Sequence, residues 1–401
     1  MKRSNTILAA AFLILLTAMA GYALLHGEEM REDILTQWNQ QEGQEESSAA
    51  DKLAFAAHRM EGSLNAVLDR DHRFIQLYGA IQRATGQRFV EDSYSYSVIR
   101  LDNGTLTFGS VGQAQKDVSH NAAATARFAA KLAEQGIPFS VIMPPQKVPQ
   151  HTEYVPAALR DFHNEEADQF LSLLEQEGVH TADLRDEMGD DLTDSFYRTD
   201  HHWNADGAFR GNRLMTAALA EEYGFAPFED GLEEGQFARQ VYPDLFLGSQ
   251  GKRVGTLYAG TDDFVVYSPE FPTELTYRVA DNAAPRTGTL NEALYFTEYL
   301  APDWFSGNPY VTFAGGDWGK ATVTNHQNPE GPSVVMIRDS FGCAITPFFA
   351  LQCSQLVTID LRAYGGGDLA GEIAAIDPDF VVLLYNPSTT VSDNMFAFGV
   401  N

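Results

Sequence analysis

The sequence predicts an α/β fold in which helices cover both faces of a parallel sheet. Two observations predict it. Short apolar runs alternate with amphipathic segments of helical period over residues 121–224 and 333–385, and a polar residue follows several of these runs. Continuous apolar runs are typical of strands buried on both faces, and their alternation with helices is typical of parallel sheets. In such sheets, ligands bind beyond the carboxyl ends of the strands.

The first alternating stretch predicts helices and strands in turn. Its helices are expected at 121–135, 162–177 and 205–223, and its strands at 139–143 and 180–184. Asn204 is the expected N-cap of the third helix, because its side chain can accept a hydrogen bond from a free helix N–H. Gly224 is the expected stop, because glycine readily adopts the left-handed conformation.

The second stretch repeats the pattern near the C-terminus. Strands are expected at 333–337, 355–361 and 380–385, and helices at 342–351 and 368–376. Lys147, Ser340, Arg362 and Asn386 each come just after a predicted strand. Because the carboxyl ends of parallel strands meet at one edge of the sheet, we expect these four side chains to lie along that edge.

Ser340 is a candidate nucleophile. It stands between a buried strand and a helix, where the amides at the start of the helix favour developing negative charge. A serine hydroxyl also needs a base. The segment 198–203 offers Asp200, His201 and His202. If that segment is extended, residues i and i+2 share a face, so Asp200 orients His202 and His202 deprotonates Ser340. His201 is left for structure or substrate.

Two other interpretations of this segment stay open. Asp200, His201 and His202 could bind a metal, although a metal site needs at least three ligands and no second cluster of ligand residues is evident. The segment could also be an ordinary loop that caps the following helix. We predict neither a metal nor another cofactor.

An acyl-transfer site needs hydrogen-bond donors for the oxyanion. The backbone amides from Ser340 to Gly342 are expected to supply one or two, and the Asn386 side chain or the Arg362 guanidinium another. Asn386 could instead form a turn beside Pro387, and Arg362 a surface ion pair. The further substrate-binding candidates are Lys147, His201, Trp203 and Tyr385.

Composition limits the classes of partner. Hydrophobic residues make up 44% of the chain and aromatic residues 11%, as in a globular protein. The net charge of −28 argues against a nucleic-acid partner, because binding phosphate needs a basic face. It also weighs against a strongly anionic polymer, unless a local cluster such as Lys252-Arg253 offsets the field.

Residues 1–27 predict a membrane anchor. Lys2 and Arg3 precede an apolar run from Ile7 to Leu25, and a helix of that length rises close to the ~30 Å thickness of the hydrocarbon core. The basic residues keep the N-terminus in the cytoplasm, so the body of the protein is expected outside. A signal peptide cleaved near Ala18-Met19-Ala20 is the alternative, with the same consequence for the body.

We divide the rest of the chain into a helical membrane-proximal region, 28–90, and one α/β domain, 91–401. A β-hairpin over 98–108, with an Asn-Gly turn, is expected early in the domain. An insertion at about 225–330 holds short β-like pieces at 263–267, 274–279 and 310–313. Because it separates the histidines from Ser340 in the sequence, we expect it to cap or build the substrate cleft.

Cys343 and Cys353 are predicted to be buried thiols. If residues 342–351 are helical, the two Cα atoms lie ~15 Å apart, beyond the ~7 Å that a disulfide spans.

Residues 199–203, Thr-Asp-His-His-Trp, followed by residues 337–342, Ile-Arg-Asp-Ser-Phe-Gly, resemble the DHHW family. That family is similar to the SGNH-hydrolase-like proteins of alginate O-acetylation, the AlgX and AlgJ type. The resemblance implies a three-layer, flavodoxin-like SGNH fold with Asp200, His202 and Ser340 as the triad. Arg338 stands where the usual esterase pattern has a glycine.

The resemblance also implies a function. The expected activity is a serine-dependent, extracytoplasmic O-acetyltransferase that acts on a cell-surface polysaccharide or oligosaccharide through an acetyl-Ser intermediate. Its expected partners are a membrane-bound acyl-donor protein and, through the N-terminal helix, the cell membrane, which it crosses once. The alternatives are a carbohydrate acetyl esterase and a non-catalytic glycan-binding protein that uses Trp203, Trp304 and Trp318.

Overall fold

The structure is a computed structural model. It describes residues 72–91, 97–109, 114–149, 161–279 and 284–399, and isolated positions between 13 and 32. The chain divides into two compact units, 1–85 and 86–401. The smaller unit contains helix α4 (Arg73–Ala84). Most of the predicted anchor, and the part of the predicted membrane-proximal region before residue 72, lie outside the described residues. Within the described part, no helix has both the length and the apolar character needed to cross a membrane.

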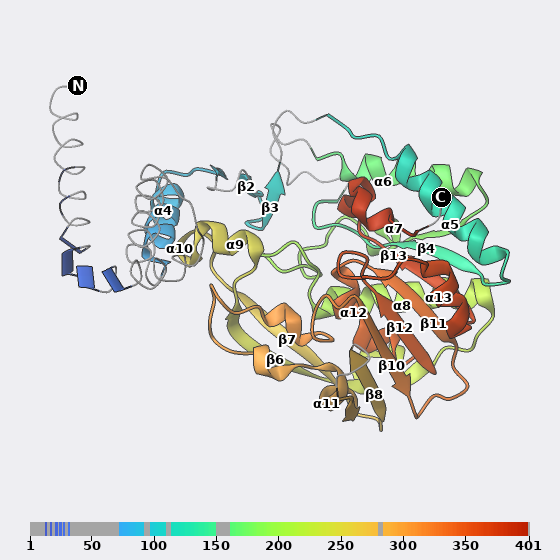
Figure 1. Cartoon of the computed structure of the whole chain (residues 1–401). Helices are drawn as coiled ribbons and strands as arrows, with labels where there is room; N and C mark the ends of the chain where they lie inside the picture. Colours follow the sequence, from blue (N-terminus) through green and yellow to red (C-terminus); the bar gives the residue numbers. More distant parts are fainter. Residues whose placement is uncertain are drawn as a thin grey trace, which may run out of the picture. The chain divides into compact units, whose positions relative to one another are not determined.

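Eight strands of the described residues form one sheet, in the order β5-β4-β13-β11-β12-β10-β8-β9 (Figure 1). The first five are mutually parallel, as predicted. All five were expected; four come from short apolar runs and are mostly buried because helices cover both faces, whereas the residues of β5 are partly buried. Their bounds are β5 (His180–Asp183), β4 (Phe139–Met143), β13 (Phe380–Leu384), β11 (Ser333–Arg338) and β12 (Gln355–Ile359).

The expectation of a wholly parallel sheet is corrected, because the sheet is mixed. The insertion contributes β10 (Lys320–Asn325), β8 (Leu275–Val279) and β9 (Arg286–Gly288), which extend the sheet beyond β12 in antiparallel order (Figure 1). Alternate residues of β10 are buried, the pattern of a strand with one face on the core. The insertion therefore supplies three strands of the sheet.

The sheet lies between two helical layers. Alternate residues of β11 point to opposite faces: Val335 and Ile337 join the core under α5, α6 and α13, while Val334 and Met336 join the core under α8 and α12. The helices are α5 (Ser119–Ala133), α6 (His163–Gln176), α13 (Leu369–Ile376), α8 (Ala205–Tyr223) and α12 (Phe341–Phe349). The Asn204 side chain accepts from the Gly207 N–H, and Gly224 ends α8 at φ 71°, which confirms both predicted ends.

The remaining elements are short. The predicted hairpin is confirmed as β2 (Ser97–Arg100) with β3 (Leu106–Gly109), and β1 (Phe89–Glu91) pairs with β2. Residues 310–313 do not form the expected strand. Pro309 instead begins a 3₁₀ helix, η5, because its fixed φ suits a first helical position. The insertion also holds α9 (Ser249–Val254), α10 (Thr256–Ala259), α11 (Leu290–Leu294) and the ribbon of β6 (Phe237–Phe246) and β7 (Asp262–Pro269).

Some short helices lie outside these groups. They are α7 (Arg185–Met188) and the 3₁₀ helices η2 (Glu229–Leu232), η3 (Glu234–Gln236), η4 (Thr297–Tyr299), η6 (Pro387–Val391) and η7 (Asp393–Phe396).

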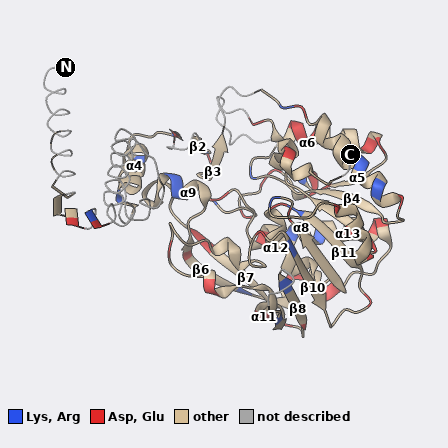
Figure 2. Cartoon of the chain, in the orientation of Figure 1, with Lys and Arg blue, Asp and Glu red and all other residues tan. Residues whose placement is uncertain are grey.

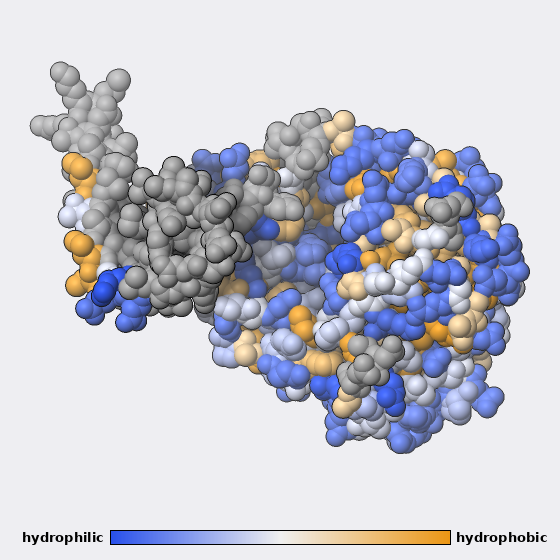
Figure 3. Space-filling view, viewed as in Figure 1, coloured by the Kyte–Doolittle hydropathy of each residue, from blue (hydrophilic) through white to orange (hydrophobic). Residues whose placement is uncertain are grey.

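The surface of the larger unit is acidic and hydrophilic, as the composition indicates, and the two cysteines are as predicted. Acidic residues are spread over the helices and loops of the larger unit (Figure 2), and hydrophilic residues dominate the face shown in Figure 3. Cys343 and Cys353 are both free and buried, as predicted.

Candidate active site

Ser340 lies at the junction of β11 and α12, at the carboxyl edge of the parallel strands. The strand before it is buried to its last residue, Arg338, and α12 begins at Phe341. Ser340 itself is half-buried. Its hydroxyl is therefore held by a rigid strand and a rigid helix while one side stays open.

His202 and Asp200 complete a chain of hydrogen bonds to this hydroxyl. The distance from Ser340 Oγ to His202 Nε2 is 2.6 Å, and that from His202 Nδ1 to Asp200 Oδ1 is 2.5 Å. The backbone from Asp200 to His202 forms a bend. Within it, Asp200 Oδ1 also accepts a hydrogen bond from the His202 backbone N–H at 3.0 Å. The prediction of an extended segment is thus corrected, although the pairing of residues i and i+2 is as expected.

The Asp200 carboxylate is buried and fully hydrogen-bonded. Its Oδ2 accepts from the Ser249 N–H at 2.6 Å. Burial alone would raise the pKa of Asp200, but the charges of His201 and His202 and the hydrogen bonds from His202 and Ser249 lower that pKa well below its ordinary value. Asp200 is therefore ionised at neutral pH and can stabilise a positive charge on His202.

Lys147 holds the histidine loop. Its Nζ donates to the carbonyl oxygens of Arg198 and Asp200, each at 2.8 Å, and to Gln250 Oε1 at 3.1 Å. Burial lowers the pKa of Lys147 to about 7. These three bonds occupy all of the ammonium hydrogens, so Lys147 supports the loop in place of the predicted substrate contact.

Two residues of the site were missed by sequence reasoning. The Tyr310 ring stacks on the His202 ring, with centroids 4.1 Å apart and planes at 14°, and its hydroxyl donates to the Ser340 carbonyl at 3.0 Å. Asp262 accepts from the N–H groups of Arg198 and Thr199, each at 2.8 Å. Neither residue belongs to a recognisable motif. Both come from the insertion and restrict the motion of the His202 segment and of Ser340.

Trp203 and Tyr385, predicted to contact substrate, lie in the core. The Trp203 side chain is fully buried and its Nε1 donates to the Phe341 carbonyl at 3.0 Å. Tyr385 is equally buried, and its hydroxyl donates to the Met395 carbonyl at 2.7 Å. Trp203 therefore anchors the start of α12 to the histidine segment, and Tyr385 anchors the C-terminal segment.

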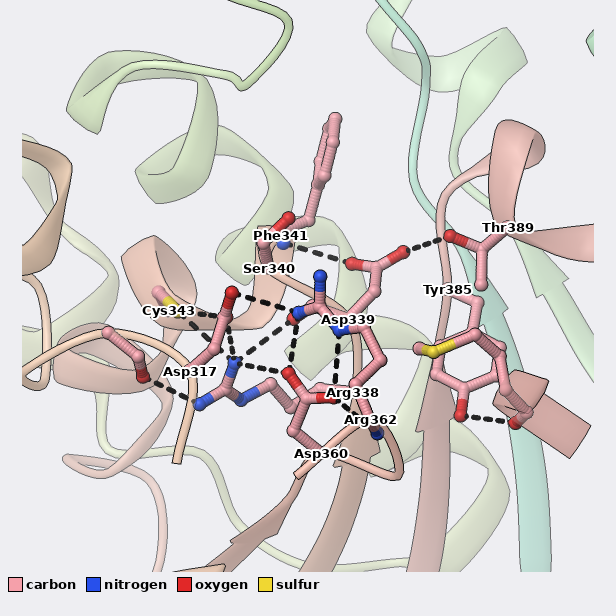
Figure 4. A network of polar contacts seen from close by, with 12 residues as sticks. Asp317, Arg338, Asp339, Ser340, Phe341, Cys343, Asp360, Arg362, Tyr385 and Thr389 are labelled. Atoms are coloured by element: carbon pink, nitrogen blue, oxygen red, sulfur yellow. Dashed lines mark hydrogen bonds and ion pairs between the residues drawn. The ribbon is translucent and has the colours of Figure 1, made fainter. Parts of the chain in front are cut away.

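Asn386 supports the residue before the nucleophile. Its backbone N–H and its Nδ2 both donate to Asp339 Oδ2, at 2.8 and 2.7 Å, and Nδ2 also donates to Thr389 Oγ1. Thr389 donates to the same carboxylate oxygen (Figure 4). To donate to an oxyanion, as predicted, Asn386 would have to give up one of these bonds.

The backbone donors at the junction are not equally free. The Phe341 N–H donates to Asp339 Oδ1 at 2.9 Å, and the Gly342 N–H donates to the Asp339 carbonyl at 3.0 Å. Among the described residues, the Ser340 N–H is the one of the three predicted amides without a partner. It is accordingly the best placed of the three to meet an oxyanion.

Arg362 and His201 lie at the margin of the site. The Arg362 guanidinium forms ion pairs with Asp360 at 2.5 Å and Asp317 at 3.0 Å (Figure 4), and its side chain is about 39% exposed. His201 Nδ1 contacts Ser249 Oγ at 3.0 Å, and the His201 ring packs against the His202 ring at 3.8 Å. Both side chains remain partly open to a bound molecule.

The histidine segment also brings together potential metal ligands. One ligand atom each from Asp200, His201 and His202 lie within 4.8 Å of one another. However, His202 uses both ring nitrogens in hydrogen bonds, to Asp200 and to Ser340. The arrangement therefore favours proton transfer over ligation, because a metal on His202 would break this chain.

Gly248→Ala is expected to disturb this site from outside it. A Cβ at Gly248 would lie 2.2 Å from Asp200 Cβ and 2.6 Å from its Cα, so the Asp200 segment must move. A displacement of ~1 Å at a catalytic group costs about 10²-fold in rate, and we expect that loss in kcat/KM. Gly235→Ala is the control, because no heavy atom lies within 4 Å of its added Cβ. Equal rates for the two variants would contradict the role given to the Asp200 position.

Comparisons with known proteins show the family and the fold of the chain. The family model described as SGNH hydrolase-like domain, acetyltransferase AlgX, matches residues 108–316, a little over half of the chain. The match includes Asp200 and His202 and ends before Ser340. No curated protein matches the chain.

Solved structures share the fold. Bacillus cereus PatB1 is 21% identical with a TM-score of 0.63, covering 76% of this chain and 99% of PatB1. PatB1 with a sulfonyl adduct is 20% identical with a TM-score of 0.61, covering 75% and 97%. A DHHW family protein from Eubacterium siraeum is 19% identical with a TM-score of 0.60, covering 78% and 98%. The resemblance predicted from the two motifs is confirmed.

Proposed function

Because this chain belongs to the AlgX-type family of SGNH hydrolase-like acetyltransferase domains, we propose that it is a serine-dependent O-acetyltransferase acting on a polysaccharide. One observation carries the proposal: the unbroken chain of hydrogen bonds from Ser340 Oγ through His202 to the buried Asp200 carboxylate. This arrangement is that of a Ser-His-Asp triad, in which the acid orients and stabilises the base.

In the first half-reaction, Ser340 Oγ attacks the carbonyl carbon of an acetyl ester while His202 Nε2 takes the hydroxyl proton. The carbonyl oxygen becomes an oxyanion, which the Ser340 N–H at the start of α12 stabilises. The bond from the carbonyl carbon to the donor oxygen then breaks, and that oxygen receives the proton from His202. Acetyl-Ser340 and a free donor hydroxyl remain.

In the second half-reaction, a sugar hydroxyl replaces the donor. His202 takes the proton of that hydroxyl as its oxygen attacks the acetyl carbon, and Ser340 Oγ leaves with the proton. The products are an acetylated sugar and the free enzyme. If water takes the place of the sugar, the same steps yield free acetate, and the enzyme is an esterase.

The setting of the reaction is part of the proposal. The apolar run from Ile7 to Leu25, preceded by Lys2 and Arg3, supports a body held outside the cytoplasm by an N-terminal anchor. Acetyl groups would then reach Ser340 from a membrane-bound donor protein. A β-lactamase fused after residue 401 tests the orientation, because it should confer ampicillin resistance only if exported. Lack of resistance from an expressed fusion would contradict the proposed location.

Covalent labelling tests the nucleophile. A structure of PatB1 carries a sulfonyl adduct, which suggests phenylmethanesulfonyl fluoride as the probe. We expect the full-length protein to gain one sulfonyl group on Ser340, with loss of fluoride, and to stop turning over 4-nitrophenyl acetate. Ser340→Ala should neither label nor turn over the ester. Unchanged turnover in that variant would overturn the mechanism.

Acceptor competition separates the transferase from the esterase. With 4-nitrophenyl acetate as donor, a transferase should convert added oligosaccharide to its acetyl ester, at the expense of free acetate. An esterase should release the same acetate with and without oligosaccharide. Mass spectrometry of the oligosaccharide and an acetate assay measure the two products.

A further inference from the structure

A pocket outside the triad lies at the same edge of the sheet as Ser340. It occupies about 430 Å³ at the ends of β8, β10 and β12, in the range of ~300–1,000 Å³ found for small-ligand sites. Lys320 of β10 and Ile337 of β11 both pair with Ile359 of β12, so the pocket is two strands from the strand of the nucleophile. At ~4.8 Å per strand, that separation is roughly 10 Å.

Trp318 forms an aromatic wall of this pocket and is about 39% exposed. Its position depends on the turn before it, where Gly315 and Gly316 adopt φ values of 74° and 91°. A Cβ at Gly315 would lie 2.7 Å from Trp318 Nε1. The indole therefore packs against a left-handed glycine turn, in the space that a Cβ at Gly315 would occupy.

The facing wall is polar. Glu372 pairs with Lys320 and accepts from the Tyr364 hydroxyl. The two walls meet at Gly319. Its backbone packs so closely against the Ala363 carbonyl that a Cβ there would lie 2.4 Å from the carbonyl oxygen. Glu372 compensates the charge of Lys320, whereas Arg278 adds a positive charge to the lining. The net charge of the chain, −28, still disfavours an anionic sugar.

The pocket is tied to the nucleophile by the residue before the tryptophan. Asp317 accepts from Arg338 Nη1 at 2.7 Å and pairs with Arg362 at 3.0 Å (Figure 4). Arg338 is the last residue of β11, two residues before Ser340. A ligand bound at Trp318 would thereby be held at a set distance from the Ser340 hydroxyl.

We propose that this pocket binds one neutral pyranose residue of the acceptor polysaccharide. The proposal rests on the proposed function, to which it adds the substrate class. A pyranose presents a face of C–H groups that suits the negative face of an indole, while its hydroxyls suit the Tyr364, Glu372 and Lys320 groups opposite. Trp203 is buried and cannot serve in this way, whereas Trp318 can.

Binding to the Ser340→Ala protein separates this proposal from the acyl chemistry, because no turnover is needed. Cellohexaose and chitohexaose are the neutral probes, and hexamannuronate is the anionic one. Calorimetry and tryptophan fluorescence report binding. We expect a neutral probe to bind, and Trp318→Ala in this background to raise its dissociation constant about tenfold or more. Trp318→Phe, which keeps an aromatic face, should recover part of the affinity.

Trp304→Ala is the matched control. Trp304 is also about 39% exposed, but its Nε1 donates to the Asp244 carbonyl in the insertion, away from the pocket-lining residues. It should keep both the affinity and the fluorescence change. Thermal unfolding of every variant separates a lost site from a lost fold. The proposal is overturned if the two tryptophan variants bind alike, if neither neutral probe binds, or if hexamannuronate binds more tightly.

Discussion

Asp200→Asn is expected to lower kcat for acetyl-ester turnover by about 10⁴-fold, with little change in KM. The magnitude is that of a triad whose base is left in the wrong tautomer. Asp200 is buried and touches neither the reacting hydroxyl nor the open side of the site, so ground-state binding should not depend on it. The loss should therefore appear in the chemical step.

Neither orientation of the asparagine amide can keep the hydrogen bonds that the Asp200 carboxylate accepts. Both oxygens of the Asp200 carboxylate accept from N–H groups: Oδ1 from His202 and Oδ2 from the Ser249 amide. If the new amide group faces Ser249, two donors oppose each other. If it faces His202, it donates to Nδ1, and the proton of the ring then sits on Nε2. In that tautomer His202 donates to Ser340 and cannot accept its proton.

Rates with 4-nitrophenyl acetate for the wild type, Asp200→Asn and Asp230→Asn test this expectation. Asp230 is exposed, so its variant makes the same charge change away from the site and should keep the wild-type rate. A deficit below tenfold in Asp200→Asn would contradict the assigned role.

The free energy of unfolding should also depend on pH. Because the folded-state pKa of Asp200 is lowered, its ionisation stabilises the protein above pH ~4, and this contribution is lost as pH falls through the folded value.

The nucleophile junction could be predicted because its signals are local. Apolar residues, a charged pair and a serine stand together in one short segment, and the structure forms a strand, a turn and a helix there. The ends of α8 were predictable for the same reason, since Asn204 and Gly224 act on their immediate neighbours. Such features depend on few residues and little on the rest of the fold.

The antiparallel part of the sheet depends on contacts between distant residues. Strand β10 pairs with β12 on one side and β8 on the other, and nothing in its own residues specifies those partners. Tyr310 and Asp262 reach the site only after the insertion folds against it. Their positions could not be derived from spacing, because spacing reports only local geometry.

Arg338 shows how a departure from a familiar pattern is accommodated. The sequence has an arginine where a glycine usually precedes Asp-Ser, and the structure buries that arginine almost completely. Its aliphatic stem fills the space beside Gly342, where a Cβ would lie 2.5 Å from Arg338 Cδ. Gly342, predicted as an oxyanion donor, thus has a steric reason to be glycine. The guanidinium lies among the Asp317 carboxylate, the Asp360 carboxylate and the Gly316 carbonyl (Figure 4).

Arg338→Met is therefore expected to reduce the free energy of unfolding by about 3 kcal/mol, the lower end for removing one partner of a buried ion pair. Asp360 is fully buried and, among the described residues, would keep Arg362 as its one cationic partner. Arg362→Met is the matched control. Its side chain is about 39% exposed, so solvent screening should limit its loss to ~1 kcal/mol. Urea unfolding followed by circular dichroism measures both.

A double-mutant cycle identifies the cause of that loss. If the unpaired Asp360 carboxylate is responsible, Arg338→Met combined with Asp360→Asn should lose less stability than the sum of the two single variants. If the cause is the cavity left by the guanidinium, the two losses should add. Additivity would mean that the arginine holds the nucleophile strand by its volume, and the electrostatic role given to the Arg338–Asp360 pair would then be wrong.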